Sequence, residues 1–257
     1  MKASAFKYFV VIVALLAMTL PVFAAGDFIV IVDAGHGGKD PGCTGKKCLE
    51  KNVTLDVARR LAQRINNELP GVRALMTRTG DRTMELGERA SFANRNNGQL
   101  FISIHVNSVD EKTKNRASIK GAQVYSAPLH MITKNFDIIA RHSAITEIEK
   151  GGRRVSRKYN ARSVESKLVF ELTQEGNYEE STRFASLAQQ HLINDAGRAD
   201  KGVLQASYYV LWAVDMPSVL VELDFMCNPA QEAFLNSEEG RRKCADALFN
   251  ALREFMK

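Results

Sequence analysis

The chain has 257 residues, of which 45% are hydrophobic and 25% are charged, and its formal net charge is +6. The composition is that of a soluble globular protein, and the length allows one large domain or two small ones with a sizeable core. The positive charges are spread along the chain, which argues against nucleic acid as a ligand and suits a polyanionic surface or polymer.

The first 24 residues have the pattern of a secretory signal peptide. Lys2 and Lys7 precede a compact apolar run over residues 8–20, and small residues follow it, which predicts cleavage after Ala24. An uncleaved membrane anchor is the alternative, although the run is short for a span. Cleavage removes two lysines and no acidic residue, so the formal charge falls from +6 to +4. We expect a domain over residues 25–257, exported to the periplasm or cell envelope, with no membrane span.

Strand and helix patterns alternate along this domain. Strands are predicted over residues 28–33, 72–78, 100–106, 121–126, 207–211 and 217–223, and helices over 52–69, 84–97 and 238–256. This order predicts an α/β fold in one domain, with helices on both faces of a sheet. Residues 130–182 break the alternation and form an insertion. It is either a lid, regulatory element or mobile loop, or a solvated surface excursion.

Four cysteines fall into two close pairs, Cys43 with Cys48 and Cys227 with Cys244. An even number in an exported protein indicates disulfides, with three connectivities to choose from. Zinc binding by the cysteines is disfavoured by export and because neither pair has C-x-x-C spacing. We predict a Cys43–Cys48 bond that closes a loop tip, and Cys227 as a free thiol near the candidate site.

The segment DAGHGGKDPG, residues 33–42, follows the first predicted strand. A phosphate cradle needs a helix directly after its glycines, usually as G-x-G-x-x-G or G-x-x-x-x-G-K-[ST]. This segment has neither spacing, and Pro41-Gly42 interrupts any helix start. Metal binding explains the loop better, because it places His36 just past the end of a strand.

Two further residues of the metal-ligand type belong to the same predicted sheet edge. His105 lies near the end of the strand over residues 100–106, and Glu50 lies where the first helix begins. Ligand sites in open α/β sheets form beyond the carboxyl ends of the strands, and catalytic zinc takes three protein ligands. Singly, each residue has an ordinary structural alternative, such as a glutamate that complements a helix dipole. Together they predict a zinc site.

Glu222 ends the apolar strand PSVLVEL, where a charge is costly without a role or a partner. A carboxylate beside a zinc site can act as a general base. The structural alternative is an ion pair with an arginine such as Arg82 or Arg89.

These residues lie in an ordered set of motifs that resembles the zinc-dependent N-acetylmuramoyl-L-alanine amidases of bacterial cell walls, the amidase type 3 group. The motifs run in the family's order from about Asp27 to the C-terminus, over nearly the whole domain. They are IVIVDAGHGGKDPG, EKNVTLDVARRLAQRI, TRTGDRTMELGERASFAN, LFISIHVNS and YYVLWAVDMPSVLVELDFMCNP.

The resemblance implies a twisted, six-stranded mixed sheet flanked by helices, with the insertion after the strand that carries His105. It implies Zn²⁺ as the cofactor, with His36, Glu50 and His105 as ligands and Glu222 as the catalytic glutamate. The implied reaction is hydrolysis of the amide between the lactyl group of N-acetylmuramic acid and L-alanine, which releases the stem peptide of peptidoglycan. A zinc peptidase that cuts within the stem peptide, or an inactive peptidoglycan-binding module, is the alternative.

Some members of this family carry a helix in the insertion that blocks the zinc with a glutamate until an activator protein displaces it. Residues 142–150 lie in the corresponding region and offer Glu147 or Glu149. The resemblance therefore implies autoinhibition and an activator as a partner, besides peptidoglycan itself. We expect the chain to be a monomer.

The chain departs from the family pattern V-E-x-G-F-x-S-N at two positions. Asp224 replaces the glycine, and Cys227 replaces the serine. Asp224 follows Glu222 by two residues, which predicts a carboxylate on the same strand face that raises the pKa of Glu222 or contacts substrate. Cys227 predicts sensitivity to oxidation.

Overall fold

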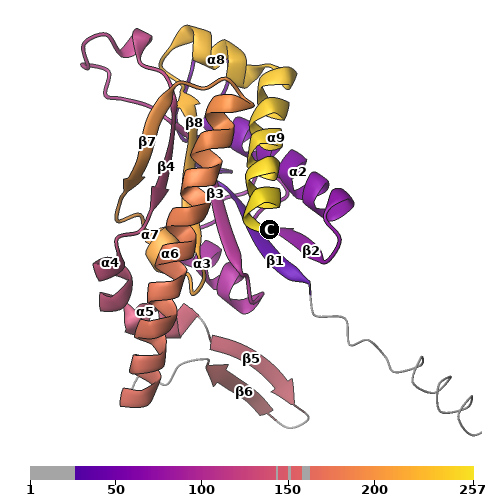
Figure 1. The fold of residues 1–257 in the computed structure, drawn as a ribbon, viewed down its shortest axis with the longest axis vertical. Helices are drawn as coiled ribbons and strands as arrows, with labels where there is room; N and C mark the ends of the chain where they lie inside the picture. The colour runs from indigo at the N-terminus through magenta and orange to yellow at the C-terminus, as the bar shows by residue number, and fades with distance from the viewer. Residues whose placement is uncertain (1–26, 143, 150–151, 158–162) are drawn as a thin grey trace, which may run out of the picture.

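The β-branched run FIVIVDA forms β1 (Phe28–Ala34), an inner strand of a six-stranded sheet (Figure 1). The structure is a computed structural model that describes residues 27–142, 144–149, 152–157 and 163–257. The predicted signal peptide lies outside the described residues. No described helix has the length and apolar character needed to cross a membrane.

The strand order in the sheet is β2-β1-β3-β8-β4-β7. All neighbouring pairs are parallel except β4 and β8, which are antiparallel, so the predicted mixed six-stranded sheet is confirmed. The other five strands are β2 (Val72–Met76), β3 (Leu100–Asn107), β4 (Ala122–Ser126), β7 (Asp200–Gln205) and β8 (Ser218–Phe225).

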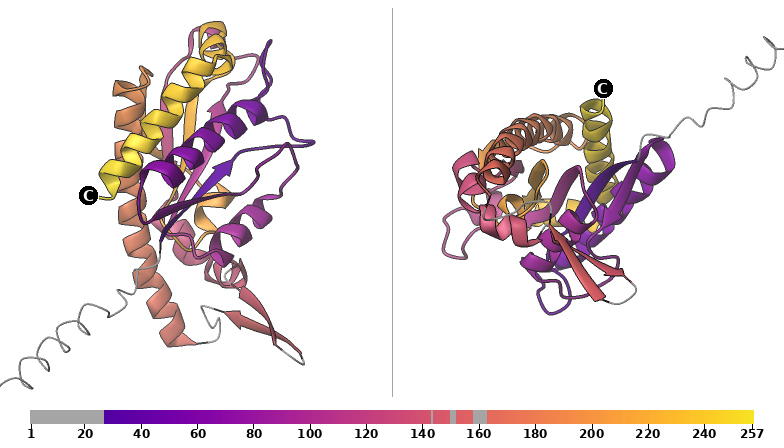
Figure 2. Two further views of the ribbon diagram at one scale, coloured as in Figure 1. Left: turned by 90° about the vertical axis from the view of Figure 1, so that its right-hand side faces the viewer. Right: turned by 90° about the horizontal axis from the view of Figure 1, so that it is seen from below.

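Helices cover both faces of the sheet, as Figures 1 and 2 show. The first face packs against three long helices, α2 (Glu50–Glu68), α6 (Val164–Asn194) and α9 (Glu238–Phe255). The second face packs against four shorter helices, α3 (Leu86–Arg95), α4 (Leu129–Lys134), α5 (Phe136–His142) and α7 (Tyr209–Trp212). A further helix, α8 (Pro229–Asn236), and a 3₁₀ turn, η1 (Arg116–Ser118), complete the fold.

Side chains on β3 alternate between the two hydrophobic cores. Ile102 and Ile104 lie in the core of the first face, and Phe101 lies in the core of the second. Because successive residues of a strand point to opposite faces, His105 belongs to the second face. The same alternation on β8 places Val221 in the first core and Glu222 on the second face.

The prediction of a strand over residues 207–211 is wrong, because this segment contains the short helix α7. Val210 and Leu211 are both buried in the core of the second face. One helical turn places these two consecutive residues on the same face of the sheet. The edge strand β7 was not predicted. Its sequence DKGVLQ is exposed or half-buried throughout and has no apolar run.

The insertion is more regular than its sequence indicates. All of residues 164–182 belong to the 31-residue helix α6, whose first turns leave Val164, Leu168 and Leu172 more than half exposed. The second half of α6 packs on the first face through Phe184, Ala185, Ala188 and Leu192. Between α5 and α6, strands β5 (Ala144–Glu149) and β6 (Gly152–Arg157) form an antiparallel hairpin.

The predicted Cys43–Cys48 disulfide is wrong for this structure, in which all four cysteines are free thiols. The chain makes a tight turn between them, with the Gly45 amide donating to the Cys48 carbonyl. However, Cys43 Sγ faces the carbonyl of Val106, whereas Cys48 Sγ faces the sulfur of Met226. The two thiols thus have different neighbours and are not bonded to each other.

Candidate functional site

Three adjacent parallel strands, β1, β3 and β8, end at the same edge of the sheet. His36 follows β1 by two residues, while His105 and Glu222 are register partners on β3 and β8. The loop after β1 returns to the sheet at the start of α2, where Glu50 is the first helical residue. The topology therefore brings all four predicted site residues to one edge of the sheet.

The two imidazoles converge on one carboxylate oxygen. Glu50 Oε1 lies 3.1 Å from Nε2 of His36 and 3.0 Å from Nδ1 of His105. It also accepts a hydrogen bond from the amide of Val106, and Oε2 accepts one from the amide of Cys43. The Glu50 side chain is only 2% exposed. Burial opposes its charge, but hydrogen bonds from both histidines outweigh burial and hold the pKa of Glu50 far below its usual value.

The glycine-rich loop lets the backbone pass close to these side chains. His36 has a φ of 59°, the left-handed conformation that few residues with a Cβ adopt. A Cβ on Gly35 would overlap the His105 ring, and a Cβ on Gly42 would overlap the carboxylate of Glu50. The glycines therefore permit a close approach between the loop and the candidate ligands.

Asp40 is a hydrogen-bond partner of His36 that the sequence analysis missed. Its Oδ2 lies 2.7 Å from Nδ1 of His36, and its Oδ1 accepts the amide of Gly42. Burial lowers the pKa of His36, yet hydrogen bonds and charge from Glu50 and Asp40 raise it overall to about 9. A carboxylate on the second nitrogen of a histidine is the usual companion of a metal-bound imidazole. The sequence signal that could have identified this contact is the position of Asp40, four residues after His36.

Glu222 is half-buried and carries an unpaired buried oxygen. Among the described residues, no group makes a hydrogen bond to its Oε2. Gln123 is its register neighbour on β4, but Oε1 of Gln123 accepts from Asn107 and Tyr125 instead. Burial, helped by the charge of Glu50, raises the pKa of Glu222 to about 7. That value suits a group that takes up and releases a proton near neutral pH.

The alternative ion pair of Glu222 with Arg82 or Arg89 is not formed in this structure, where both arginines have other partners. Arg89 is buried, and its Nη1 lies 2.7 Å from Oδ1 of Asp33. Arg82 donates to the carbonyl of Thr77. Neither guanidinium is therefore available to Glu222.

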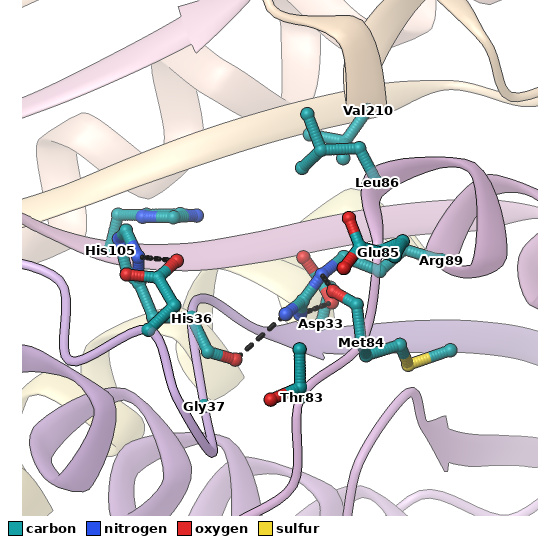
Figure 3. A pocket seen from close by; sticks show the side chains of 11 residues that line it. Asp33, His36, Gly37, Thr83, Met84, Glu85, Leu86, Arg89, His105 and Val210 are labelled. Atoms are coloured by element: carbon teal, nitrogen blue, oxygen red, sulfur yellow. Dashed lines mark hydrogen bonds and ion pairs between the residues drawn. The ribbon is translucent and has the colours of Figure 1, made fainter.

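A pocket of about 200 Å³ opens beside the two histidines. Figure 3 shows His36 and His105 at one side, with Leu86 and Val210 forming an apolar wall and Arg89 reaching toward Asp33. The second oxygen of Asp33 accepts from Ser103, and Thr77 donates to the first. Both carboxylate oxygens of Asp33, which lines the pocket, are therefore paired.

Asp224 does not act on Glu222 as predicted. Its Oδ2 forms an ion pair of 2.9 Å with Arg198, and its Oδ1 accepts the amide of Gly121. Burial and the charge of Glu50 raise the pKa of Glu222 against the opposing effect of the two histidines, and Asp224 is not among the causes. Asp224 therefore ties β8 to the loops before β4 and β7. Cys227 is a half-buried free thiol whose Sγ donates a hydrogen bond to the carbonyl of Arg116. Its predicted sensitivity to oxidation stays a prediction.

The predicted inhibitory glutamates do not lie on a helix. Glu147 and Glu149 belong to β5, where their register partners on β6 are Arg154 and Gly152. The structure describes the strands of this hairpin but not the positions of its side chains. The autoinhibition therefore stays a prediction.

The residues at this edge fit a divalent metal. One ligand atom from each of His36, Glu50 and His105 lies within 4.8 Å of the others. Two imidazoles and one carboxylate form a known donor set for catalytic zinc, which leaves a coordination position open. The unpaired oxygen of Glu222 on the adjacent strand has the chemistry of a base beside that position.

Comparison with known proteins gives a family match over most of the chain. The family model described as N-acetylmuramoyl-L-alanine amidase matches residues 30–254. YqiI of Bacillus subtilis is 31% identical over 226 residues, which cover 88% of this chain and 84% of that protein.

Two relatives carry the activity in their names. The N-acetylmuramoyl-L-alanine amidase AmiC of Neisseria meningitidis is 30% identical, and the match covers 89% of this chain but only 52% of AmiC. The solved structure of the amidase AmiC2 of Nostoc punctiforme superimposes with a TM-score of 0.66 at 26% identity, covering 90% of this chain and 98% of that one. The chain therefore corresponds to about half of the meningococcal relative and to nearly the whole of the Nostoc structure.

The buried pair of Asp33 and Arg89 predicts a pH-dependent effect of the substitution Arg89→Met. Burial opposes the charge of Asp33, but Arg89 and three hydrogen bonds outweigh it and lower its pKa below 3.8. In the native protein this stabilisation is present above pH 3.8 and is lost as pH falls through the lowered pKa. Without Arg89, burial dominates, so we expect Asp33 to become easier to protonate.

Urea unfolding of the metal-free protein should show Arg89→Met less stable by about 3 kcal/mol at pH 7, with a smaller deficit at pH 4. Arg95→Met, an exposed change on the same helix, should stay within about 0.5 kcal/mol of the unsubstituted protein. An equal loss of unfolding free energy in Arg89→Met at both pH values would contradict the role of Arg89 as the charge partner of Asp33.

Proposed function

The chain belongs to the family of N-acetylmuramoyl-L-alanine amidases, and from this we propose how its residues perform the hydrolysis. The substrate bond joins the lactyl group of N-acetylmuramic acid to L-alanine of the stem peptide. We assign His36, Glu50 and His105 as zinc ligands and Glu222 as the proton-transfer group. Asp40 holds the imidazole of His36 through its second nitrogen.

Zinc bound by these three side chains would polarise the scissile carbonyl and make an attacking water more acidic. Glu222 takes the proton of that water at its Oε2. It then delivers the proton to the nitrogen of L-alanine as the amide bond breaks. Leu86 and Val210 provide an apolar wall to the pocket beside His36 and His105.

The observation that carries this proposal is the unpaired oxygen of Glu222 beside the cluster. A buried carboxylate oxygen without a hydrogen bond is costly in a merely structural role. This free-energy cost is explained if the oxygen accepts a proton from the water that attacks the substrate. An inactive binding module has no need of such a group, nor of three converging metal-type donors.

Replacing the proton-transfer group should remove activity without removing the metal. We expect Glu222→Gln to lower kcat by about 10²–10⁴-fold on purified peptidoglycan, because the amide cannot accept a proton. Glu239→Gln, an exposed change on α9, should retain activity. Mass spectrometry of the digest should show intact stem peptides and glycan without peptide. Shortened stem peptides would instead indicate a peptidase, and a fully active Glu222→Gln would refute the assigned base.

Removal of the metal should abolish activity and lower stability. Binding to the folded state alone, at about 1,000 times the dissociation constant, adds about 4 kcal/mol to the free energy of unfolding. We therefore expect a chelator to lower the melting temperature and added zinc to restore both properties. Elemental analysis should find one zinc per chain, and much less in His105→Asn. Full activity after exhaustive chelation would contradict the metal assignment.

Export would deliver the enzyme to its polymeric substrate. We infer that residues 1–24 direct export and are removed after Ala24, which leaves a mildly basic domain suited to the carboxylates of peptidoglycan. Sequencing the N-terminus of the exported protein should give Ala25 as the first residue. Retention of the first 24 residues would favour the membrane-anchor alternative.

A further inference from the structure

Cationic side chains hold the backbone of the loop that carries His36. The carbonyl oxygens of Ala34 and Gly35 accept from Arg78, and those of Ala34 and His36 accept from Arg89. The loop therefore rests on two buried guanidinium groups.

The two arginines differ in how their charge is balanced. Arg89 forms an ion pair with Asp33. Arg78 is only 1% exposed, yet its described partners are backbone carbonyls and the hydroxyl of Thr54, with no carboxylate in contact. Burial and the charge of Arg89 lower the pKa of Arg78 to about 10, so it remains charged at neutral pH. A buried charge without a carboxylate partner is costly, which calls for a specific reason to keep it.

The acceptors of Arg78 come from separate segments of the chain. Nε donates to Ala34 over 2.9 Å, and Nη2 donates to Gly35 and to Lys51, each over 2.8 Å. Nη1 donates to the carbonyl of Gly80 over 3.1 Å. The planar fork of a guanidinium can serve all these acceptors at once, whereas a lysine ammonium cannot copy that geometry.

These acceptors adjoin two of the three proposed ligands. Gly35 immediately precedes His36, and Lys51 immediately follows Glu50. One nitrogen of Arg78 thus joins the backbones on either side of the His36–Glu50 contact. Thr54 reinforces the link, because its hydroxyl also donates to the carbonyl of Gly35.

We propose that Arg78 is a positioning residue that sets the separation of His36 and Glu50 and so prepares the site for zinc. This inference rests on the proposed function, since it assumes that these side chains bind the metal. Arg78 touches neither substrate nor metal, and acts through the backbone alone. Loss of groups that orient metal ligands typically weakens metal binding by about 10–100-fold.

The test compares zinc affinity in the unsubstituted protein, Arg78→Met and Arg78→Lys, with Arg59→Met as the control. Arg59 is exposed and also donates to a carbonyl, that of Thr79, which follows Arg78 in the chain but accepts no hydrogen bond from Arg78. Affinity is measured by competition with a chromophoric chelator, and ligand geometry by the visible spectrum of the Co²⁺-substituted proteins. Circular dichroism establishes that each variant is folded at the temperature of the measurement.

We expect Arg78→Met to raise the zinc dissociation constant by about 10–100-fold and to change the Co²⁺ spectrum, while Arg59→Met leaves both unchanged. A folded Arg78→Met with the original affinity and spectrum would overturn the inference. If Arg78→Met does not fold, Arg78→Lys decides in the same way, since it keeps the charge but loses the fork. If the unsubstituted protein binds no zinc, the proposed function fails and the inference with it.

Discussion

The buried carboxylate of Glu50 is the contact on which the site depends. Four donors from two segments meet it: the His36 imidazole and the Cys43 amide on the loop after β1, and the His105 imidazole and the Val106 amide at the end of β3. A charge buried to this degree must be compensated locally, so the loop after β1, the start of α2 and the end of β3 are held in one arrangement. Gly42 also passes close to it, where a Cβ would collide with the carboxylate itself.

The sequence was sufficient to predict the central strands and the site residues on them. Buried parallel strands have continuous apolar runs, and their carboxyl ends meet at one edge, so His36, His105 and Glu222 could be grouped without coordinates. Features that depend on tertiary contacts were not accessible. β7 is an exposed edge strand without a hydrophobic pattern, and α7 is a single turn whose residues are apolar because the second core surrounds them.

Partners across the sheet explain the remaining differences between expectation and structure. Asp224 lies two residues from Glu222, yet its carboxylate is occupied by Arg198, a residue 26 positions earlier that no local pattern connects to it. Cys43 and Cys48 are close in sequence and point to different neighbours. In both cases spacing along the chain indicated proximity, whereas side-chain direction decided the contact.

The single antiparallel pair of the sheet limits how the insertion can reach the site. Because β4 runs opposite to β8, its last residue lies at the end of the sheet away from the zinc-type ligands, and α4, α5 and the β5–β6 hairpin depart from there (Figure 1). Five residues of strand span roughly 17 Å at about 3.3 Å per residue. Any segment of the insertion that occludes His36 must therefore double back along the second face by about the length of β4. The point at which the insertion joins the sheet therefore lies at the opposite end of β4 from the candidate site.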